Sequence, residues 1–264
     1  MAQQKVKYTD TERTPAERAR ALLEEMTLDE KMAQLGCIFP FGDSYDDMEQ
    51  QALEMPYGIG QVSTLEMRRI RTLEEAAGWQ RKMQETVMRQ SPHHIPAIFH
   101  MEGLCGAFIQ EGTSFPSGIA RGSGWDPELE EKIAKVVAKQ EAACGITHIL
   151  APVLDISRDS RMGRQGETYG EDPALAAALG TAYTKGIQTT EAGGRRPESV
   201  AKHFLGFHNS QGGIHGTNSD TPSRLMEEIY GKPFQSAISE SGLKGVMPCY
   251  NSIDGEPASV SHRL

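Results

Sequence analysis

Five short apolar runs, separated by segments long enough to form helices, constrain the fold of this chain more than any other feature. They cover residues 57–63, 95–100, 148–156, 199–207 and 245–250. Several contain Val, Ile or Phe without strict alternation of apolar and polar residues, as is typical of strands buried on both faces of a parallel sheet. Alternating strands and helices predict an α/β fold, which is either an open doubly wound sheet or a (β/α)8 barrel.

Four of the helices between these runs carry clear start signals. Thr14 and Thr27 each stand three residues before a glutamate, in the capping-box pattern, and Asp126 and Asp172 each precede a proline. We expect these four residues to cap helices that begin at the next position. The helix after Asp126 should end at Gly145, since glycine readily adopts the left-handed conformation that ends helices, and the last helix should run to about position 186.

The polar residues near the strand ends favour the barrel over the open sheet. They are His100 and Glu102, residues 155–164, Lys202 and His203, and Tyr250 and Asn251. A barrel builds its site from the C-terminal ends of many strands, whereas an open sheet concentrates it at one switch point. We predict an α/β fold of the (β/α)8 TIM-barrel type that is incomplete, with about five of eight strands. Residues 1–56 are expected to form a helical lead-in and residues 57–264 the partial barrel.

Composition excludes several classes of function. The formal net charge of −9 and the lack of a basic stripe argue against a nucleic-acid partner. The polar N-terminus lacks the apolar core of a secretory signal, and no run reaches the roughly 18 apolar residues of a membrane span, so we expect a cytoplasmic protein with no membrane partner. Four scattered cysteines without CxxC spacing predict neither a zinc site nor a disulfide framework, and nothing predicts a cofactor.

Two segments carry most of the candidate chemistry. Residues 150–173, LAPVLDISRDSRMGRQGETYGEDP, place acidic and arginine side chains in and directly after an apolar run. They could form an exposed salt-bridged loop. They also suit a sugar, because a carboxylate accepts from two adjacent hydroxyl groups and a guanidinium donates to two. Lys202 and His203 follow on the next run, where the simplest interpretation is a solvated lysine beside a histidine with satisfied hydrogen bonds.

The order of these motifs resembles family 3 glycoside hydrolases. LAPVLDISRDSRMGR followed by ETYGEDP is similar to the signature of that family. IPAIFHMEGLCGAF, GWDPEL, VAKHFLGF and VMPCYNSIDGEPAS resemble further segments of the family in the same order, from about Glu17 onward. The resemblance implies the N-terminal barrel domain of a retaining, exo-acting β-glycosidase that hydrolyses O-glycosyl bonds of β-glucosides or β-xylosides. Its partner would be a small oligosaccharide or glycoside substrate.

Carried over residue by residue, the resemblance implies a pocket for the nonreducing-end sugar. Its members would be Glu102, Arg161, Lys202, His203 and Tyr250. Glu102 would accept hydrogen bonds from sugar hydroxyls, and Arg161 would donate to them. Lys202 and His203 would contact two further hydroxyls, and Tyr250 would line the floor near the anomeric carbon.

Other residues near this pocket are given bracing roles, or depart from the family pattern. The resemblance assigns Arg164, Glu167, Glu171 and Asp172 to bracing the loop. Ser160 and Met162 replace the usual proline and tryptophan, and Cys105 stands where many relatives have histidine. Glu102 reaches one methylene further than the usual aspartate, which would crowd a C6 hydroxymethyl group and favour a pentose.

The resemblance assigns no catalytic residue to this sequence. In family 3 the nucleophile is an aspartate on the strand after the one that ends in Tyr250, and the acid/base residue usually comes from a second domain. We therefore expect an N-terminal fragment that is inactive alone and is completed by a C-terminal portion of the same enzyme.

Three alternatives remain open at this stage. The chain could belong to the N-acetylhexosaminidase branch of the family, although FLGFHNSQGGIHGTNSD lacks the GHGDT run of that branch. It could be a non-catalytic sugar-binding or scaffold module. It could also be an unrelated barrel enzyme with Lys202 as a Schiff-base nucleophile. A metal site formed by His203, His208 and His215 is weakly supported, because loop histidines are usually polar surface.

Overall fold

The computed structural model describes residues 7–42, 44–194 and 196–264, and these divide into two compact units. The first unit contains the described residues up to Ser63 together with Arg81–Ile98. The second contains Thr64–Gln80 and Phe99–Leu264. The predicted boundary between residues 56 and 57 stays a prediction.

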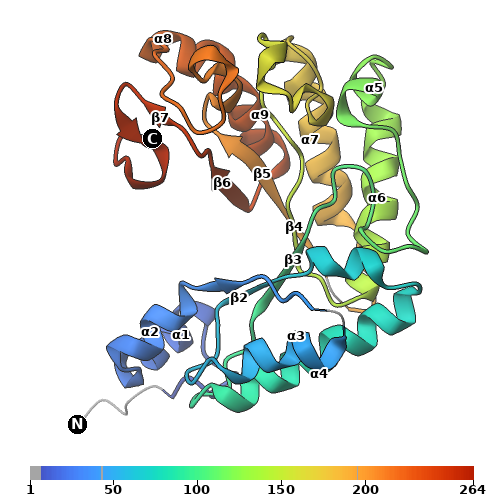
Figure 1. Ribbon diagram of the computed structural model, residues 1–264. Coiled ribbons are helices and arrows are strands. Elements are labelled where there is room, and N and C mark those ends of the chain that lie inside the picture. The colour runs from blue at the N-terminus through green and yellow to red at the C-terminus, as the bar shows by residue number, and fades with distance from the viewer. Residues whose placement is uncertain (1–6, 43, 195) are drawn as a thin grey trace. The chain divides into compact units, whose positions relative to one another are not determined.

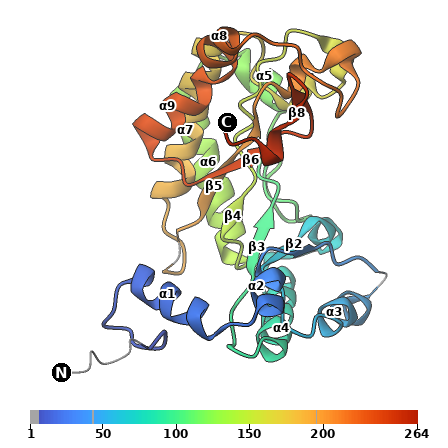
Figure 2. The same ribbon diagram turned by 90° about the vertical axis from the view of Figure 1, so that its left-hand side faces the viewer.

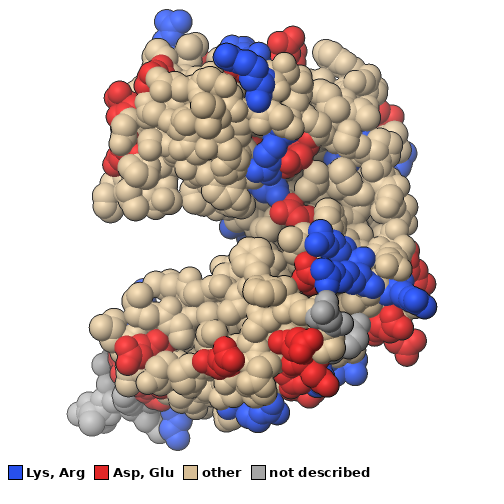
Figure 3. All heavy atoms as spheres, viewed as in Figure 1, with Lys and Arg blue, Asp and Glu red and all other residues tan. Residues whose placement is uncertain are grey.

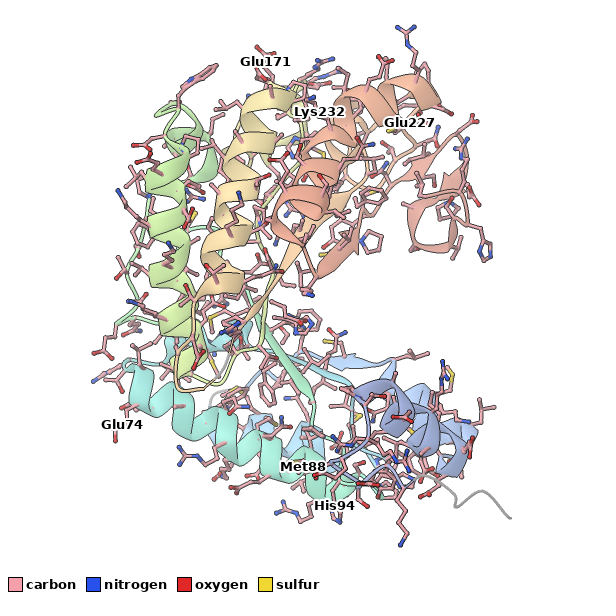
Figure 4. The ribbon with its side chains drawn as sticks, turned by 180° about the vertical axis from the view of Figure 1, so that it is seen from behind. Glu74, Met88, His94, Glu171, Glu227 and Lys232 are labelled. Carbon is pink, nitrogen blue, oxygen red and sulfur yellow. The ribbon has the colours of Figure 1, made fainter. Side chains whose placement is uncertain are left out.

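The first unit is built from helices around two short parallel strands. Its elements are α1 (Pro15–Glu25), α2 (Leu28–Gln34), β1 (Cys37–Ile38), α3 (Tyr45–Leu53), β2 (Gln61–Ser63) and the second half of α4 (Leu73–Gln90). Thr14 and Thr27 cap α1 and α2 with complete capping boxes, which confirms both predicted starts. The sequence did not predict β1, because two residues are too few to form a recognisable apolar run. At the end of α4, Met88 and His94 lie together (Figure 4), and the Met88 carbonyl is 3.1 Å from His94 Nδ1.

The second unit contains four parallel strands that pair in chain order. They are β3 (Ile98–Met101), β4 (His148–Ile149), β5 (Glu198–Phe204) and β6 (Gly245–Pro248). Helices α6 (Pro127–Ala143), α7 (Pro173–Thr189) and α9 (Lys232–Ser241) lie side by side along this sheet, and shorter helices α5 (Gly118–Gly122) and α8 (Ser223–Leu225) precede α6 and α9 (Figures 1 and 2). A short hairpin of β7 (Ser252–Ile253) and β8 (Glu256–Pro257) follows β6. The α/β arrangement with parallel strands matches the prediction.

The helix boundaries of this unit follow the predicted capping residues. Asp126 caps α6 and Asp172 caps α7, each with a proline at the first helical position. The helix α6 ends before Gly145, whose φ of 81° is the left-handed value expected there. The helix α7 runs three residues further than predicted, to Thr189. The strand β4 is much shorter than its apolar run, and beyond it the run pairs with β5 through an isolated bridge between Val153 and Lys202.

Two apolar clusters fill the core between the sheet and the helices. One joins Leu154 and Ile156 to Leu179 of α7 and Phe234 of α9. The other joins α6, α7 and β4 around residues such as Val137, Ile149 and Tyr183. Full burial of one such side chain contributes about 1.5–3 kcal/mol, so these clusters hold the strand ends in a fixed arrangement.

The carboxyl ends of the strands lie where the following helices begin. Figure 4 shows Glu171, Glu227 and Lys232 at this end of the second unit, near the starts of α7 and α9. The face of this unit seen in Figure 3 mixes acidic and basic side chains rather than collecting one sign of charge. Within the described ranges, no helix is both long and apolar enough to cross a membrane.

Candidate active site

Glu102 and Lys202 form an ion pair that links the ends of β3 and β5. Glu102 directly follows β3, and Lys202 lies within β5, with β4 between the two strands. Lys202 Nζ donates a hydrogen bond to Glu102 Oε2. The lysine side chain is 2% exposed, whereas the glutamate side chain is 27% exposed. The cation is therefore buried while its carboxylate partner can still be reached from solvent. This burial rules out the solvated lysine, which was one of the two interpretations of this segment from the sequence.

His203 takes part in a buried chain of hydrogen bonds that fixes its protonation. Asp155 Oδ2 accepts from the backbone N–H of His203 at 3.1 Å and lies 2.8 Å from ring Nδ1. Arg164 Nη2 lies 3.2 Å from the other ring nitrogen, Nε2. A guanidinium can only donate, so Nε2 must accept and the ring proton must be on Nδ1. Both ring nitrogens of His203 are thus occupied.

A bidentate ion pair between Arg164 and Glu167 extends this series of hydrogen bonds. Arg164 Nε donates to Glu167 Oε1 at 2.6 Å, and Nη2 donates to Oε2 at 2.7 Å. The hydrogen bonds that Arg164 donates to Glu167 raise the pKa of the guanidinium. Burial alone would raise the pKa of the Glu167 carboxyl, but Arg164, with Lys202 adding its charge, lowers it. The Arg164 guanidinium also lies 5.1 Å from the ring centre of Phe207, a cation–π distance.

Tyr250 lies beside this chain in a group of aromatic rings. Its ring centre is 5.7 Å from that of His203 and 5.5 Å from that of the buried Phe207. The ring centre of His215 lies 4.9 Å from that of Tyr250, and the two rings are tilted by 33°. Since Tyr250 is 52% exposed, it presents a flat apolar and hydroxyl-bearing surface next to His203.

Arg161 forms its ion pair with Asp159, a residue outside the predicted pocket. Arg161 Nη2 contacts Asp159 Oδ2 at 2.6 Å, and the arginine side chain is 69% exposed. This hydrogen bond lowers the pKa of Asp159 to about 2. The arginine joined to His203 is Arg164, which the sequence analysis assigned to bracing the loop. The sugar-binding role of Arg161 stays a prediction.

Two further buried ionisable groups lie near the pocket, of which the sequence had pointed only to His100. Glu141 of α6 is fully buried, and burial, with the charge of Glu102 adding to it, raises the pKa of its carboxyl well above the usual value. Folding therefore favours the protonated form of this carboxyl. Burial, with His148 and Lys202 adding, lowers the pKa of His100 to about 4, so that imidazole is neutral. The signal for Glu141 was its position one turn after the apolar Val137 and Ala138.

The histidines of the loop after β5 do not gather around one point. His208 is buried, and desolvation lowers its pKa, while His215 is exposed against Tyr250. Over the described residues, no three or more His, Cys, Asp or Glu side chains are arranged to hold a metal ion. What this end of the sheet offers is a set of oriented donors and acceptors beside an aromatic surface, which is suited to a polyhydroxylated ligand.

Comparison with known proteins identifies the family. Residues 27–264 match the model described as the glycosyl hydrolase family 3 N terminal domain. The chain belongs to glycosyl hydrolase family 3. This confirms the resemblance carried by the motifs between Leu150 and Pro173 and by the strands around them.

Relatives with known structures or curated names support the same assignment. The chain is 35% identical over 176 residues to a β-xylosidase of Formosa agariphila, which covers 63% of this chain and 24% of that protein. It superposes on a β-glucosidase of Erythrobacter marinus with a TM-score of 0.85 and 32% identity, over 96% of this chain and 34% of the other. A Listeria innocua β-glucosidase solved in complex with glucose gives a TM-score of 0.78 and 28% identity, over 92% and 34%.

These likenesses also confirm the predicted fold class. The N-terminal domains that match in these family 3 enzymes are TIM-barrel domains. The chain spans only about a quarter to a third of the length of the relatives it matches.

Proposed function

We propose that this chain forms the sugar-binding half of a retaining, exo-acting β-glycosidase. The enzyme hydrolyses O-glycosyl bonds in β-glucosides or β-xylosides, and its substrate is a small oligosaccharide or glycoside. The single observation that carries the proposal is the Glu102–Lys202 ion pair, in which the lysine is buried and the glutamate is partly exposed. This pair lies next to His203 in a protein that belongs to family 3.

The pair suits the hydroxyl groups of a sugar ring. Each hydroxyl donates one hydrogen bond and accepts others, so adjacent hydroxyls need both an acceptor and a donor. Glu102 supplies carboxylate oxygens on its exposed side. Lys202 has three ammonium protons, of which the contact with Glu102 uses one. Tyr250 supplies a partly exposed ring against which the apolar face of a sugar can pack.

The catalytic carboxylates are proposed to come from polypeptide outside these 264 residues. Retaining hydrolysis requires a nucleophile and an acid/base residue about 5–5.5 Å apart. The site carboxylates already have partners: Glu102 contacts Lys202, Asp155 contacts His203 and Glu167 contacts Arg164. Each of these carboxylates is therefore engaged with a neighbouring side chain, which suits a binding role. The greater length of the relatives gives room for the two missing groups.

Sugar binding by the 264-residue chain tests the first half of this proposal. Glucose, xylose and gluconolactone are titrated into wild type, Glu102→Gln and a control, Lys135→Met, which alters an ion pair with Glu131 on the outside of α6. We expect wild type and Lys135→Met to bind one of these sugars alike, and Glu102→Gln to bind it at least about tenfold more weakly. Equal affinity in all three proteins, or binding of none of the sugars by wild type, would contradict the proposal.

An activity assay tests the second half. The purified chain should not turn over an aryl β-glucoside or β-xyloside, because it lacks the two catalytic carboxylates. Turnover by the 264 residues alone, abolished by Glu102→Gln, would show that the catalytic groups lie within them.

A further inference from the structure

Arg121 and Glu130 form a buried ion pair that lies outside the proposed sugar site. The Arg121 side chain is 6% exposed and that of Glu130 is 2% exposed. Arg121 Nε lies 2.9 and 3.1 Å from the two Glu130 oxygens, and the Tyr169 hydroxyl donates to Glu130 Oε1 at 2.6 Å. Burial works against the charge on Arg121, but Tyr169 and Glu130 outweigh it and raise its pKa. The guanidinium therefore stays charged inside the protein.

The other edge of the guanidinium holds the loop that follows Glu102. Arg121 Nη1 donates to the Leu104 carbonyl at 2.7 Å and to the Pro116 carbonyl at 2.6 Å. The carbonyl of Gly103 accepts from the Tyr183 hydroxyl at 2.6 Å. Both peptide carbonyls directly after Glu102 are thus held by buried side chains, which limits the directions in which Glu102 can point.

The helix that carries Arg121 also lies directly against the segment that follows Arg164. A Cβ atom placed on Gly118 would come within 2.2 Å of the Glu167 carbonyl oxygen, and one on Gly122 within 2.4 Å of the Tyr169 carbonyl oxygen. Only glycine permits this approach. Through α5, the Arg121 ion pair connects the loop bearing Glu102 with the loop bearing Arg164 and Glu167.

We propose that Arg121 is a positioning residue that sets Glu102 against Lys202 and relative to Arg164. Its planar fork reaches the Glu130 carboxylate on one edge and two carbonyl groups on the other, which a single ammonium could not do. The positioning follows from these contacts alone. Its consequence for sugar affinity rests on the proposed function.

Two variants remove the hydrogen bonds of the Arg121 guanidinium in different ways. Arg121→Lys keeps the positive charge beside Glu130 but cannot hold all the carbonyl groups. The double variant Arg121→Leu with Glu130→Leu replaces the buried ion pair by apolar side chains, a change that proteins often tolerate without loss of stability. The second variant keeps the test open if the first does not fold. Lys135→Met on the outside of α6 is the matched control.

Chemical labelling of Lys202 tests the positioning without any sugar. The amine is acylated under native conditions well below the unfolding transition, and its labelling rate is compared by mass spectrometry with that of the exposed Lys139. We expect slow labelling of Lys202 in wild type and Lys135→Met. We expect labelling on the order of tenfold faster in both Arg121 variants, approaching the rate in Glu102→Gln. A Lys202 rate unchanged from wild type in every folded Arg121 variant would overturn the inference.

Sugar titration then separates this inference from the proposed function. Where wild type binds a sugar, the Arg121 variants should bind it on the order of tenfold more weakly, because a small misplacement of a contacting group costs affinity. Unchanged affinity in those variants would overturn the positioning role. If wild type binds no sugar, the proposed function fails, and the labelling rates alone decide whether Arg121 positions Glu102.

Discussion

Removing either member of the Glu102–Lys202 pair should destabilise the second unit by very different amounts. Lys202 is buried, whereas Glu102 is partly open to solvent. Glu102→Leu therefore leaves an ammonium group inside the protein without its partner. Lys202→Met leaves a carboxylate that can turn toward water, and it fills the space of the lysine stem with a side chain of similar shape.

The expected magnitudes follow from the burial of each charge. Loss of one partner from a buried pair costs about 3–5 kcal/mol. An upper limit is set by deprotonation, since holding an ordinary lysine neutral at pH 7 costs about 4.6 kcal/mol. The charge of Lys202 lowers the pKa of the nearby Glu167, so the Glu167 carboxylate still offsets part of the lysine charge when Glu102 is removed. We expect about 3 kcal/mol for Glu102→Leu. For Lys202→Met we expect about 1 kcal/mol, the scale of an exposed pair.

Urea unfolding at pH 7, followed by tryptophan fluorescence, measures this difference for the second structural unit. Both tryptophans, Trp79 and Trp125, belong to the second unit, and the buried Trp79 gives the signal that changes on unfolding. The double variant completes a thermodynamic cycle, because it removes the stranded charge and should be more stable than Glu102→Leu. If Lys202→Met proves as destabilising as Glu102→Leu, the reasoning from burial is refuted.

Three further predictions concern other groups of the second unit. The free energy of unfolding should fall by about 3 kcal/mol as pH drops from about 6.5 to 4, because the pKa of His100 is about 4 in the folded protein and about 6.5 in the unfolded chain. Urea unfolding curves across this pH range measure the fall, and a free energy that does not change with pH would count against it. Glu141→Gln should be no less stable than wild type at pH 7, and its advantage in thermal unfolding should grow toward pH 8, since folding raises the pKa of Glu141 and the glutamine has no proton to lose. Arg164→Ala should weaken sugar binding in calorimetry more than Arg161→Ala, because only Arg164 contacts His203; the reverse order would favour the motif-based assignment.

Local signals in the sequence predicted the helices well, because capping is decided within four residues. Thr14, Thr27, Asp126 and Asp172 all cap the helices expected of them. The strands were less well defined. A two-residue strand such as β1 leaves no pattern, and in a long apolar run such as 148–156 only two residues form a regular strand, with an isolated bridge further along at Val153.

The choice between Arg161 and Arg164 could not be made from spacing. Both arginines follow the same apolar strand, and the backbone turns between them at Gly163, whose φ is 80°. On one side of this turn Arg161 pairs with Asp159, and on the other Arg164 lies against His203. A motif places two such residues in one loop, but their partners depend on the path of the loop, which spacing does not give.

The protonation of His203 determines which groups can meet a sugar first. Both of its ring nitrogens are occupied, by Asp155 on one side and Arg164 on the other. A hydroxyl group can contact Nε2 only if Arg164 moves away, whereas Lys202 has protons to spare and Glu102 a second oxygen. Of these two groups only Glu102 is open to solvent, so a sugar can meet Glu102 without rearrangement, whereas the buried Lys202 must first become accessible. The predicted contact with His203 requires the Arg164–Nε2 distance to grow beyond 3.2 Å in a sugar complex, so a complex that keeps this distance would show that His203 orients Arg164 and does not itself bind the sugar.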